Sequence, residues 1–224
     1  MIDTTDYRIE IGRAVAERLR ATPGVMQVPA TRFDIFVKRD FLTDSECDGL
    51  IERIEAGKQP STLMSDDPDP EFRTSDSCNL DPADPLVVQI EGKLARFTGI
   101  QPAHGETIQG QRYDVGQQFK PHHDFFFTEM PYWPEQERNG GQRTWTAMVF
   151  LNDVEAGGHT FFENAGVKIT PRRGNILAWN NLDAEGQPNF MSLHQGMPVE
   201  KGLKYIITKW YRERPWGSQA PAAY

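Results

Sequence analysis

The sequence predicts an α+β domain that is mainly β, with its helices toward the N-terminal end. Apolar residues recur at helical spacing in three segments before residue 100, which indicates helices. The segment from Leu203 to Tyr211 (LKYIITKWY) is instead rich in β-branched and aromatic residues, which favour strands. A length of 224 residues suits one domain, and the sequence shows neither an internal repeat nor a low-complexity linker.

The three helices are expected to pack on the outside of a β core and brace it. Residues 6–21 carry their apolar side chains at helical spacing. Thr43 and Glu46 form a capping-box pattern ahead of the second helix. Asp84 as N-cap, with Pro85 at the first helical position, opens the third. An exposed apolar face on the first helix could mediate a homodimer.

The segment PHHDF at residues 121–125 carries the pattern of a metal site. Side chains in a strand point to alternate faces, so His122 and Asp124 face one side together and His123 points to the other. A third ligand must therefore come from elsewhere in the chain. The candidates are His104, His159 and His194.

His194 is preferred as the third ligand because Lys204 follows it by ten residues, on the predicted C-terminal strand. If the even positions of that strand face the interior, the ammonium group is buried, which is costly unless it meets an anion. Two histidines and one aspartate leave an octahedral iron three open positions, enough for a bidentate 2-oxo acid and dioxygen. Lys204 could then hold the far carboxylate of 2-oxoglutarate.

Two alternatives stay open at this point. Lys204 could pair with a carboxylate of the protein, and two histidines with one aspartate can also hold zinc. The lysine favours an oxo-acid enzyme, and hence iron. A lone histidine in a β protein is more often a core or surface residue than a ligand, which is how we interpret His104, His123 and His159.

The His-x-Asp pair, the distal histidine and the later lysine together resemble the iron(II)/2-oxoglutarate dioxygenases of the prolyl 4-hydroxylase type, in a bacterial-like form with a single catalytic domain. The resemblance covers about residues 33–212, and motifs in this number and order are specific. The further segments that carry it are Arg73-Thr74-Ser75, His104-Gly105-Glu106, QRYDVGQQFKPHHD (111–124), RTWTAMVFLNDV (143–154), GGHTFF (157–162) and Lys209-Trp210.

The resemblance implies a fold and a division of the chain. The fold would be a double-stranded β-helix, a barrel of the jelly-roll or cupin type, braced by N-terminal helices. Residues 1–30 would form a helical extension, residues 31–214 the dioxygenase domain and residues 215–224 a C-terminal tail.

The resemblance also implies roles for individual residues. By similarity, iron(II) would be bound by His122, Asp124 and His194. The far carboxylate of 2-oxoglutarate would be contacted by Lys204, Tyr113 and Thr146. The substrate would face Arg143, Trp210 and Phe119.

Two of these positions carry a qualification. Phe119 stands where peptide-binding members of the family commonly have a tyrosine, and the lost hydroxyl removes one hydrogen bond to substrate, on the order of 1 kcal/mol. Arg143 differs in parity from Thr146, so a regular strand would point the two side chains to opposite faces.

The expected activity is oxidative decarboxylation of 2-oxoglutarate to succinate and carbon dioxide, coupled to hydroxylation of a prolyl residue in a peptide or protein. Dioxygen is the other cosubstrate, and ascorbate is a candidate reductant. The alternatives are hydroxylation of a free amino acid or small metabolite, which Phe119 keeps open, and a non-catalytic binding or sensor protein on the same fold. Two loops are candidate substrate elements: acidic residues 65–72 and aromatic residues 126–142.

Composition is that of an ordinary enzyme. The chain has 24 Lys and Arg against 32 Asp and Glu, a formal net charge of −8, which weakens the reading as a nucleic-acid demethylase because phosphate backbones repel it. Neither a membrane-spanning segment nor a secretory signal is expected, so a cytoplasmic location is predicted. Cys47 and Cys78 form no metal motif or disulfide framework.

Overall fold

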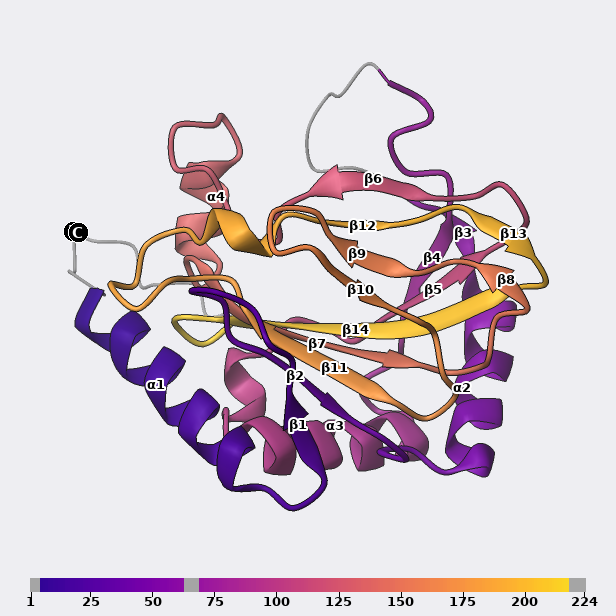
Figure 1. Ribbon diagram of the computed structural model, residues 1–224, viewed down its shortest axis with the longest axis horizontal. Helices are drawn as coiled ribbons and strands as arrows, with labels where there is room; N and C mark the ends of the chain where they lie inside the picture. Colours follow the sequence, from indigo (N-terminus) through magenta and orange to yellow (C-terminus); the bar gives the residue numbers. More distant parts are fainter. Residues whose placement is uncertain (1–4, 63–68, 218–224) are drawn as a thin grey trace.

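The computed structural model of the chain describes residues 5–62 and 69–217. Two β-sheets face each other, as the jelly-roll prediction requires (Figure 1). Within the described residues the larger sheet has eight strands, in the spatial order β1 (Val25–Gln27), β2 (Ile35–Lys38), β11 (Ile176–Asn180), β7 (Arg143–Phe150), β14 (Lys204–Arg212), β5 (Gln109–Tyr113), β4 (Asp76–Asn79) and β3 (Gln59–Pro60). All of its neighbouring strands pair antiparallel.

The smaller sheet lies over the larger one and carries part of the candidate site. Its order is β10 (Val167–Ile169), β9 (Thr160–Phe162), β12 (His194–Gly196) and β6 (Phe119–His122). A short ribbon of β8 (Ala156–Gly157) and β13 (Val199–Lys201) closes one end of the barrel. The space between the two sheets is therefore lined by strands that are far apart in the sequence.

Helices α1 (Thr5–Ala21), α2 (Asp44–Gly57) and α3 (Pro85–Thr98) lie on the side of the large sheet that faces away from the small one (Figure 1). The predicted caps are present. The Thr43 hydroxyl accepts from the Glu46 backbone N–H, and the Glu46 carboxylate accepts from the Thr43 backbone N–H. Asp84 accepts from the first backbone N–H groups of α3. All three helices predicted from the sequence are confirmed.

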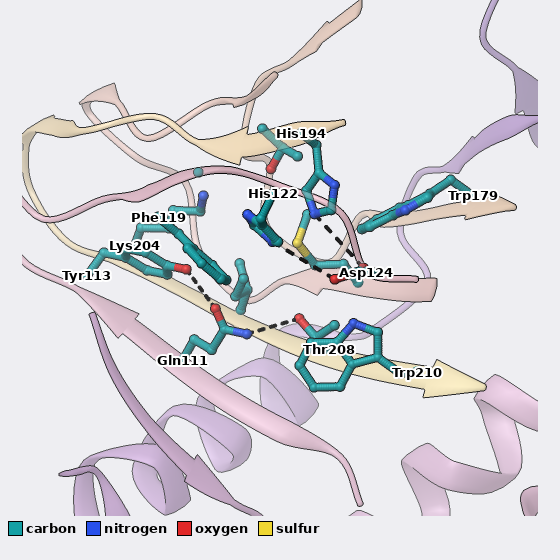
Figure 2. A pocket seen from close by; sticks show the side chains of 14 residues that line it. Gln111, Tyr113, Phe119, His122, Asp124, Trp179, His194, Lys204, Thr208 and Trp210 are labelled. Carbon is teal, nitrogen blue, oxygen red and sulfur yellow. Dashed lines mark hydrogen bonds and ion pairs between the residues drawn. The ribbon is translucent and has the colours of Figure 1, made fainter. Parts of the chain in front are cut away.

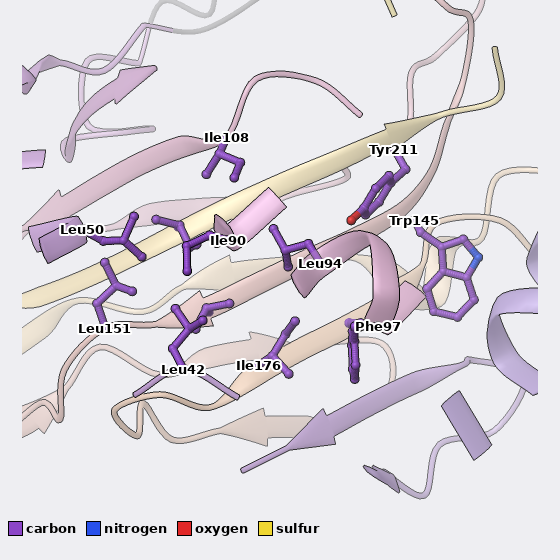
Figure 3. Packing of buried hydrophobic residues seen from close by; sticks show 14 of the residues in the cluster. Leu42, Leu50, Ile90, Leu94, Phe97, Ile108, Trp145, Leu151, Ile176 and Tyr211 are labelled. Carbon is purple, nitrogen blue, oxygen red and sulfur yellow. The ribbon is translucent and has the colours of Figure 1, made fainter. Parts of the chain in front are cut away.

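The core is split by the large sheet into two layers, because successive strand residues point to opposite faces. Trp145, Ala147 and Val149 of β7 pack toward the helices, where side chains of α3 interlock with the sheet (Figure 3). Met148 and Phe150 of the same strand pack between the two sheets. The second layer is the one that the candidate site opens into.

The apolar face of α1 is covered by the core, so the exposed face that could mediate a homodimer is not found in the described part of this helix. Val15, Ala16 and Leu19 are buried in the helix-side core, and Ile9 is the exposed large apolar residue of the described part of this helix. Residues 5–30 thus pack on the same core as the rest, and the division of the chain at residues 30 and 214 stays a prediction. In the part of the chain that the structure describes, no helix is long and apolar enough to cross a membrane.

Two register shifts interrupt the ladders that border the candidate site. One lies between β14 and β7, where Tyr211 pairs with Trp145 but Arg212 pairs with Arg143. The other lies between β12 and β6, and the local irregularity changes which side chains share a face. The loop predicted at residues 126–142 also contains a short helix, α4 (Trp133–Arg138), which the sequence analysis did not predict.

Candidate active site

The two histidines and the aspartate of the predicted metal site lie together between the sheets. His122 ends β6, His194 begins β12, and the two residues pair directly across the strands. Asp124 follows two residues after His122. One ligand atom from each residue lies within 4.8 Å of the others, and each histidine Nε2 is 3.9 Å from an oxygen of Asp124 (Figure 2). The structure therefore brings the three side chains into reach of a single ion.

Both imidazole rings are held with Nε2 directed at this point. The Nδ1 of His122 donates to the backbone carbonyl of Lys120 at 2.8 Å, and the Nδ1 of His194 donates to that of Ser192 at 2.9 Å. A carbonyl can only accept, so the proton is on Nδ1 and the Nε2 lone pair is free for a metal. Burial lowers the pKa of His122 to about 3, and the neighbouring His194 acts in the same direction, so the ring is neutral as a ligand must be.

The carboxylate of Asp124 is ionised and fixed in place. Burial works to raise its pKa, but the adjacent His194 and His122 and the positive charge of Arg143 outweigh it, and the pKa lies below its usual range. Thr146 donates to Oδ2 of Asp124 at 2.7 Å and accepts from Asn181 at 2.9 Å. Two neutral imidazoles and one oriented carboxylate are a donor set that suits iron(II) with open coordination positions.

The placement of Thr146 corrects its predicted role beside the 2-oxoglutarate carboxylate. Thr146 pairs with Trp210, and Trp210 lies six residues beyond Lys204 on β14, a separation of about 20 Å along the strand. One carboxylate cannot reach both side chains. The hydroxyl that lines the same inner cavity as Lys204 and Tyr113 is that of Thr160 on β9.

Lys204 is buried behind the metal cluster, as the strand pattern predicted. It is 1% exposed, its Nζ lies 5.0 Å from the centre of the Tyr113 ring, and no carboxylate of the described residues forms an ion pair with it. Burial lowers the pKa of the Lys204 ammonium group to about 7. The alternative that Lys204 pairs with a protein carboxylate is thus not realised in the described part of the chain.

The inner cavity between Lys204 and the metal cluster is built to take an anion. The Tyr113 hydroxyl donates to Gln111 at 2.6 Å, and the amide of Gln111 donates to Thr208 at 3.4 Å, so polar groups line its floor (Figure 2). A dicarboxylate that bound the metal at one end would supply the missing partner of Lys204 at the other. The residues present therefore fit both iron(II) and 2-oxoglutarate.

Arg143 faces the site, which overturns the parity expectation. The register shift at the start of β7 turns its side chain to the same side as Thr146. The guanidinium group binds Glu106 through two hydrogen bonds of 2.6 and 2.8 Å and lies 4.2 Å from the centre of the Trp210 ring. Glu106 also accepts from Arg212 at 2.6 Å. Burial works to raise the pKa of Glu106, but the guanidinium groups of Arg143 and Arg212 have the larger effect. The pKa of Glu106 is therefore lowered, and the carboxylate is ionised.

Phe119 forms the partition between the inner cavity and a wider outer one. Its ring stacks on His122 with 3.6 Å between centres and 14° between planes. The guanidinium group of Arg73 covers the ring at 4.8 Å. The register shift in β6 explains why Phe119 and His122 share a face although they are three residues apart.

The outer cavity has a volume of about 630 Å³ and opens onto the metal cluster. One wall is aromatic and apolar, consisting of Phe125, Phe126, Phe127, Met130, Tyr132 and Trp216. The buried amide of Gln142 fixes this wall by accepting from the Phe126 backbone N–H at 2.6 Å and donating to its carbonyl at 2.8 Å. The predicted aromatic loop thus borders the site. Of the predicted acidic loop, residues 65–68 lie outside the described residues, and Phe72 lines the cavity.

Comparison with known proteins agrees with this geometry. The sequence profile of the 2OG-Fe(II) oxygenase superfamily matches residues 108–212. The probable prolyl 4-hydroxylase 8 of Arabidopsis thaliana is 33% identical over 200 residues, covering 79% of this chain and 67% of that protein. The chain belongs to the 2OG-Fe(II) oxygenase superfamily.

Further relatives extend the comparison. The human prolyl 4-hydroxylase subunit alpha-3 is 34% identical over 184 residues, covering 80% of this chain and 34% of the human protein. A viral collagen prolyl hydroxylase from Paramecium Bursaria Chlorella virus-1, solved with 2-oxoglutarate, has a TM-score of 0.63 and 27% identity, covering 80% of this oxygenase and 95% of that chain. A Pseudomonas putida prolyl-4-hydroxylase shares the fold with a TM-score of 0.57 at 17% identity, and the match covers 91% of this chain and 99% of that chain. The protein is therefore a dioxygenase that uses iron(II), 2-oxoglutarate and dioxygen.

The other histidines of the oxygenase lie outside the metal cluster. His123 stacks on Phe125, with 4.4 Å between ring centres. His104 is hydrogen-bonded through Nδ1 to the backbone carbonyl of Arg212. His159 is not part of the cluster.

Several residues that line the oxygenase site or support its side chains were not assigned from the sequence. Gln111 could have been found, because it lies two residues before Tyr113 on one strand and must share its face. Thr160 and Asn181 left no such signal, because their neighbours in space depend on strand pairing. Arg73 lies in a segment quoted for the resemblance, but nothing in that segment shows that it reaches the cavity.

Proposed function

We propose that this oxygenase hydroxylates a prolyl residue in a peptide or protein and converts 2-oxoglutarate to succinate and carbon dioxide. The observation that carries the proposal is the position of the His122, Asp124 and His194 cluster, with the buried Lys204 on one side and a wide aromatic cavity on the other. A cavity of about 630 Å³ with an aromatic wall suits an extended peptide better than a free amino acid. The relatives named as prolyl hydroxylases support the same substrate.

In this proposal the metal is held by His122, Asp124 and His194. Lys204 and Tyr113 bind the far carboxylate of 2-oxoglutarate. When bound, iron(II) and 2-oxoglutarate supply the oxidising chemistry that inserts one atom of dioxygen into a C–H bond. Thr146 acts through Asp124: by donating to Oδ2 it holds the carboxylate in one orientation.

The remaining side chains have binding and shielding roles. Phe119 and Trp210 line both cavities, so they keep water from the reacting carbon and form the apolar sides of the space for the target ring. Arg143 lies against Trp210 and is fixed by Glu106, which makes it a rigid donor at the edge of that space. Ascorbate as reductant, a cytoplasmic location and a homodimer are parts of the prediction for which the geometry gives no support.

The test is succinate release from 2-oxoglutarate with iron(II), measured with a panel of proline-containing peptides, with free proline and without added substrate. We expect stimulation by one or more peptides, with the peptide gaining the mass of one oxygen atom on a prolyl residue. Stimulation by free proline alone would instead support the small-molecule alternative. No consumption of 2-oxoglutarate under any condition would refute the enzymatic proposal.

A further inference from the structure

Arg73 is a cation at the mouth of the site that forms no ion pair with a carboxylate of the described residues. It lines the outer cavity and donates to two neutral oxygens, the side chain of Gln109 at 2.8 Å and the backbone carbonyl of Thr62 at 3.3 Å. Its Nε is buried without a hydrogen-bond partner. A guanidinium group has five N–H donors, so most of its binding capacity is unused.

The wall of the outer cavity carries more cations than carboxylates. Arg143 and Arg212 share the carboxylate of Glu106 between them. Apart from Asp124, which belongs to the metal cluster, the wall therefore carries three guanidinium groups and one carboxylate. This excess of positive charge stands in a chain whose formal net charge is −8. An anionic ligand is what such a wall would attract.

The position of Arg73 places that ligand close to the reaction. Its guanidinium group lies over one face of Phe119, whose ring stacks on the proposed metal ligand His122. The cation lies 4.8 Å from the centre of the Phe119 ring, and that centre is 3.6 Å from the centre of the His122 ring, so one aromatic ring stands between Arg73 and a proposed metal ligand. Phe119 has no polar atom that could serve Arg73 as an acceptor.

We propose that Arg73 binds a carboxylate of the peptide substrate, carried by an acidic residue within two positions of the target prolyl residue. The inference rests on the proposed function and adds the charge of the substrate to it. A charged carboxylate on a guanidinium group is a strong, directional contact in a partly desolvated cavity. Arg73 is then a specificity-determining residue: it selects among prolyl peptides without taking part in the chemistry.

The experiment uses pairs of acetylated and amidated peptides that differ only in Glu or Gln at one position within two residues of the proline. We expect kcat/KM for the best Glu peptide to exceed that of its Gln partner by about tenfold. In Arg73→Gln the ratio should fall to about one, and in Arg73→Glu a Lys peptide should be preferred over the Glu peptide. Arg172→Gln, which removes an exposed arginine that does not line the cavity, should keep the wild-type ratio.

One further peptide and one further variant test the source of the carboxylate and the role of the positive charge. A Gln peptide that ends in a free carboxyl group near the proline shows whether a chain terminus can supply the carboxylate in place of a side chain. Arg73→Lys keeps the positive charge, so it should retain part of the preference for the Glu peptide. This variant is informative even if Arg73→Gln destabilises the protein by removing the hydrogen bond from Arg73 to Gln109. Far-UV circular dichroism and the urea unfolding midpoint verify that each variant is folded.

The outcomes are distinct for the two proposals. If prolyl peptides are hydroxylated but Glu and Gln peptides react equally, or if the preference survives in Arg73→Gln, the inference about Arg73 is wrong and the proposed function stands. If no prolyl peptide gains oxygen, the proposed function is refuted and the inference falls with it.

Discussion

Replacing Lys204 by Met should stabilise the protein without 2-oxoglutarate and weaken its use of 2-oxoglutarate. The side chain is buried, and no described carboxylate pairs with it, so its charge is a cost to the folded state until an anion binds. A pKa near 7 in the folded protein, against 10.5 for the free side chain, corresponds to about 4 kcal/mol at pH 7. Met fills a similar volume without the charge, so up to about 4 kcal/mol of stability should be gained.

The pH dependence follows with a definite sign. The penalty from Lys204 is fully present below its folded pKa of about 7, and it declines as pH rises toward the unfolded value of 10.5. Without 2-oxoglutarate, Lys204 therefore makes the free energy of unfolding of the wild type rise with pH between 7 and 10.5. The Lys204→Met variant should lack this rise. Urea unfolding at several pH values, without iron or 2-oxoglutarate, measures both effects.

The same substitution should raise the KM for 2-oxoglutarate by roughly 100-fold or more, because a buried carboxylate loses its cationic partner. Lys209→Met is the matched control. Lys209 is also buried on β14, but it is paired with Glu91 at 2.7 Å, so its removal should lower stability and leave the KM for 2-oxoglutarate unchanged. A Lys204→Met variant that is less stable than wild type, or that keeps the wild-type KM, would refute the reasoning.

Three further predictions concern the metal cluster and the charged wall. His122→Ala or Asp124→Ala should abolish peptide hydroxylation and bound iron, measured by product mass and metal content; near-normal turnover would remove the proposed ligand set. Thr146→Val removes the hydrogen bond to Asp124, so iron affinity should fall by about tenfold or more at an unchanged KM for 2-oxoglutarate, and a raised KM with normal iron affinity would restore the discarded carboxylate role. Glu106→Gln removes the carboxylate that pairs with Arg143 and Arg212, so the free energy of unfolding should drop by about 3 kcal/mol. Wild-type stability of this variant in urea would contradict the ion-pair account.

The predictions that succeeded rest on local rules. Strand alternation placed His122 and Asp124 in one cluster and Lys204 inside the barrel, and all three are where the pattern put them. Helix caps at Thr43 and Asp84 were readable because capping depends on residues close in sequence.

The predictions that failed depend on information that no short segment holds. The irregularity at the start of β7 turned Arg143 toward the site, and a register shift of this kind leaves no reliable signature in one sequence. Thr146 was misassigned because its distance from Lys204 is fixed by pairing with β14, not by spacing along the chain.

The central claim is that one site joins 2-oxoglutarate decarboxylation to hydroxylation of a peptide prolyl residue. Turnover under ¹⁸O-labelled dioxygen, with iron(II), 2-oxoglutarate and a responsive peptide, tests it most directly. The account predicts one labelled atom in the prolyl hydroxyl group and the other in succinate, in equal amounts, and neither product with the Asp124→Ala variant. Labelled succinate without labelled peptide, or peptide oxygen that comes from water, would contradict it.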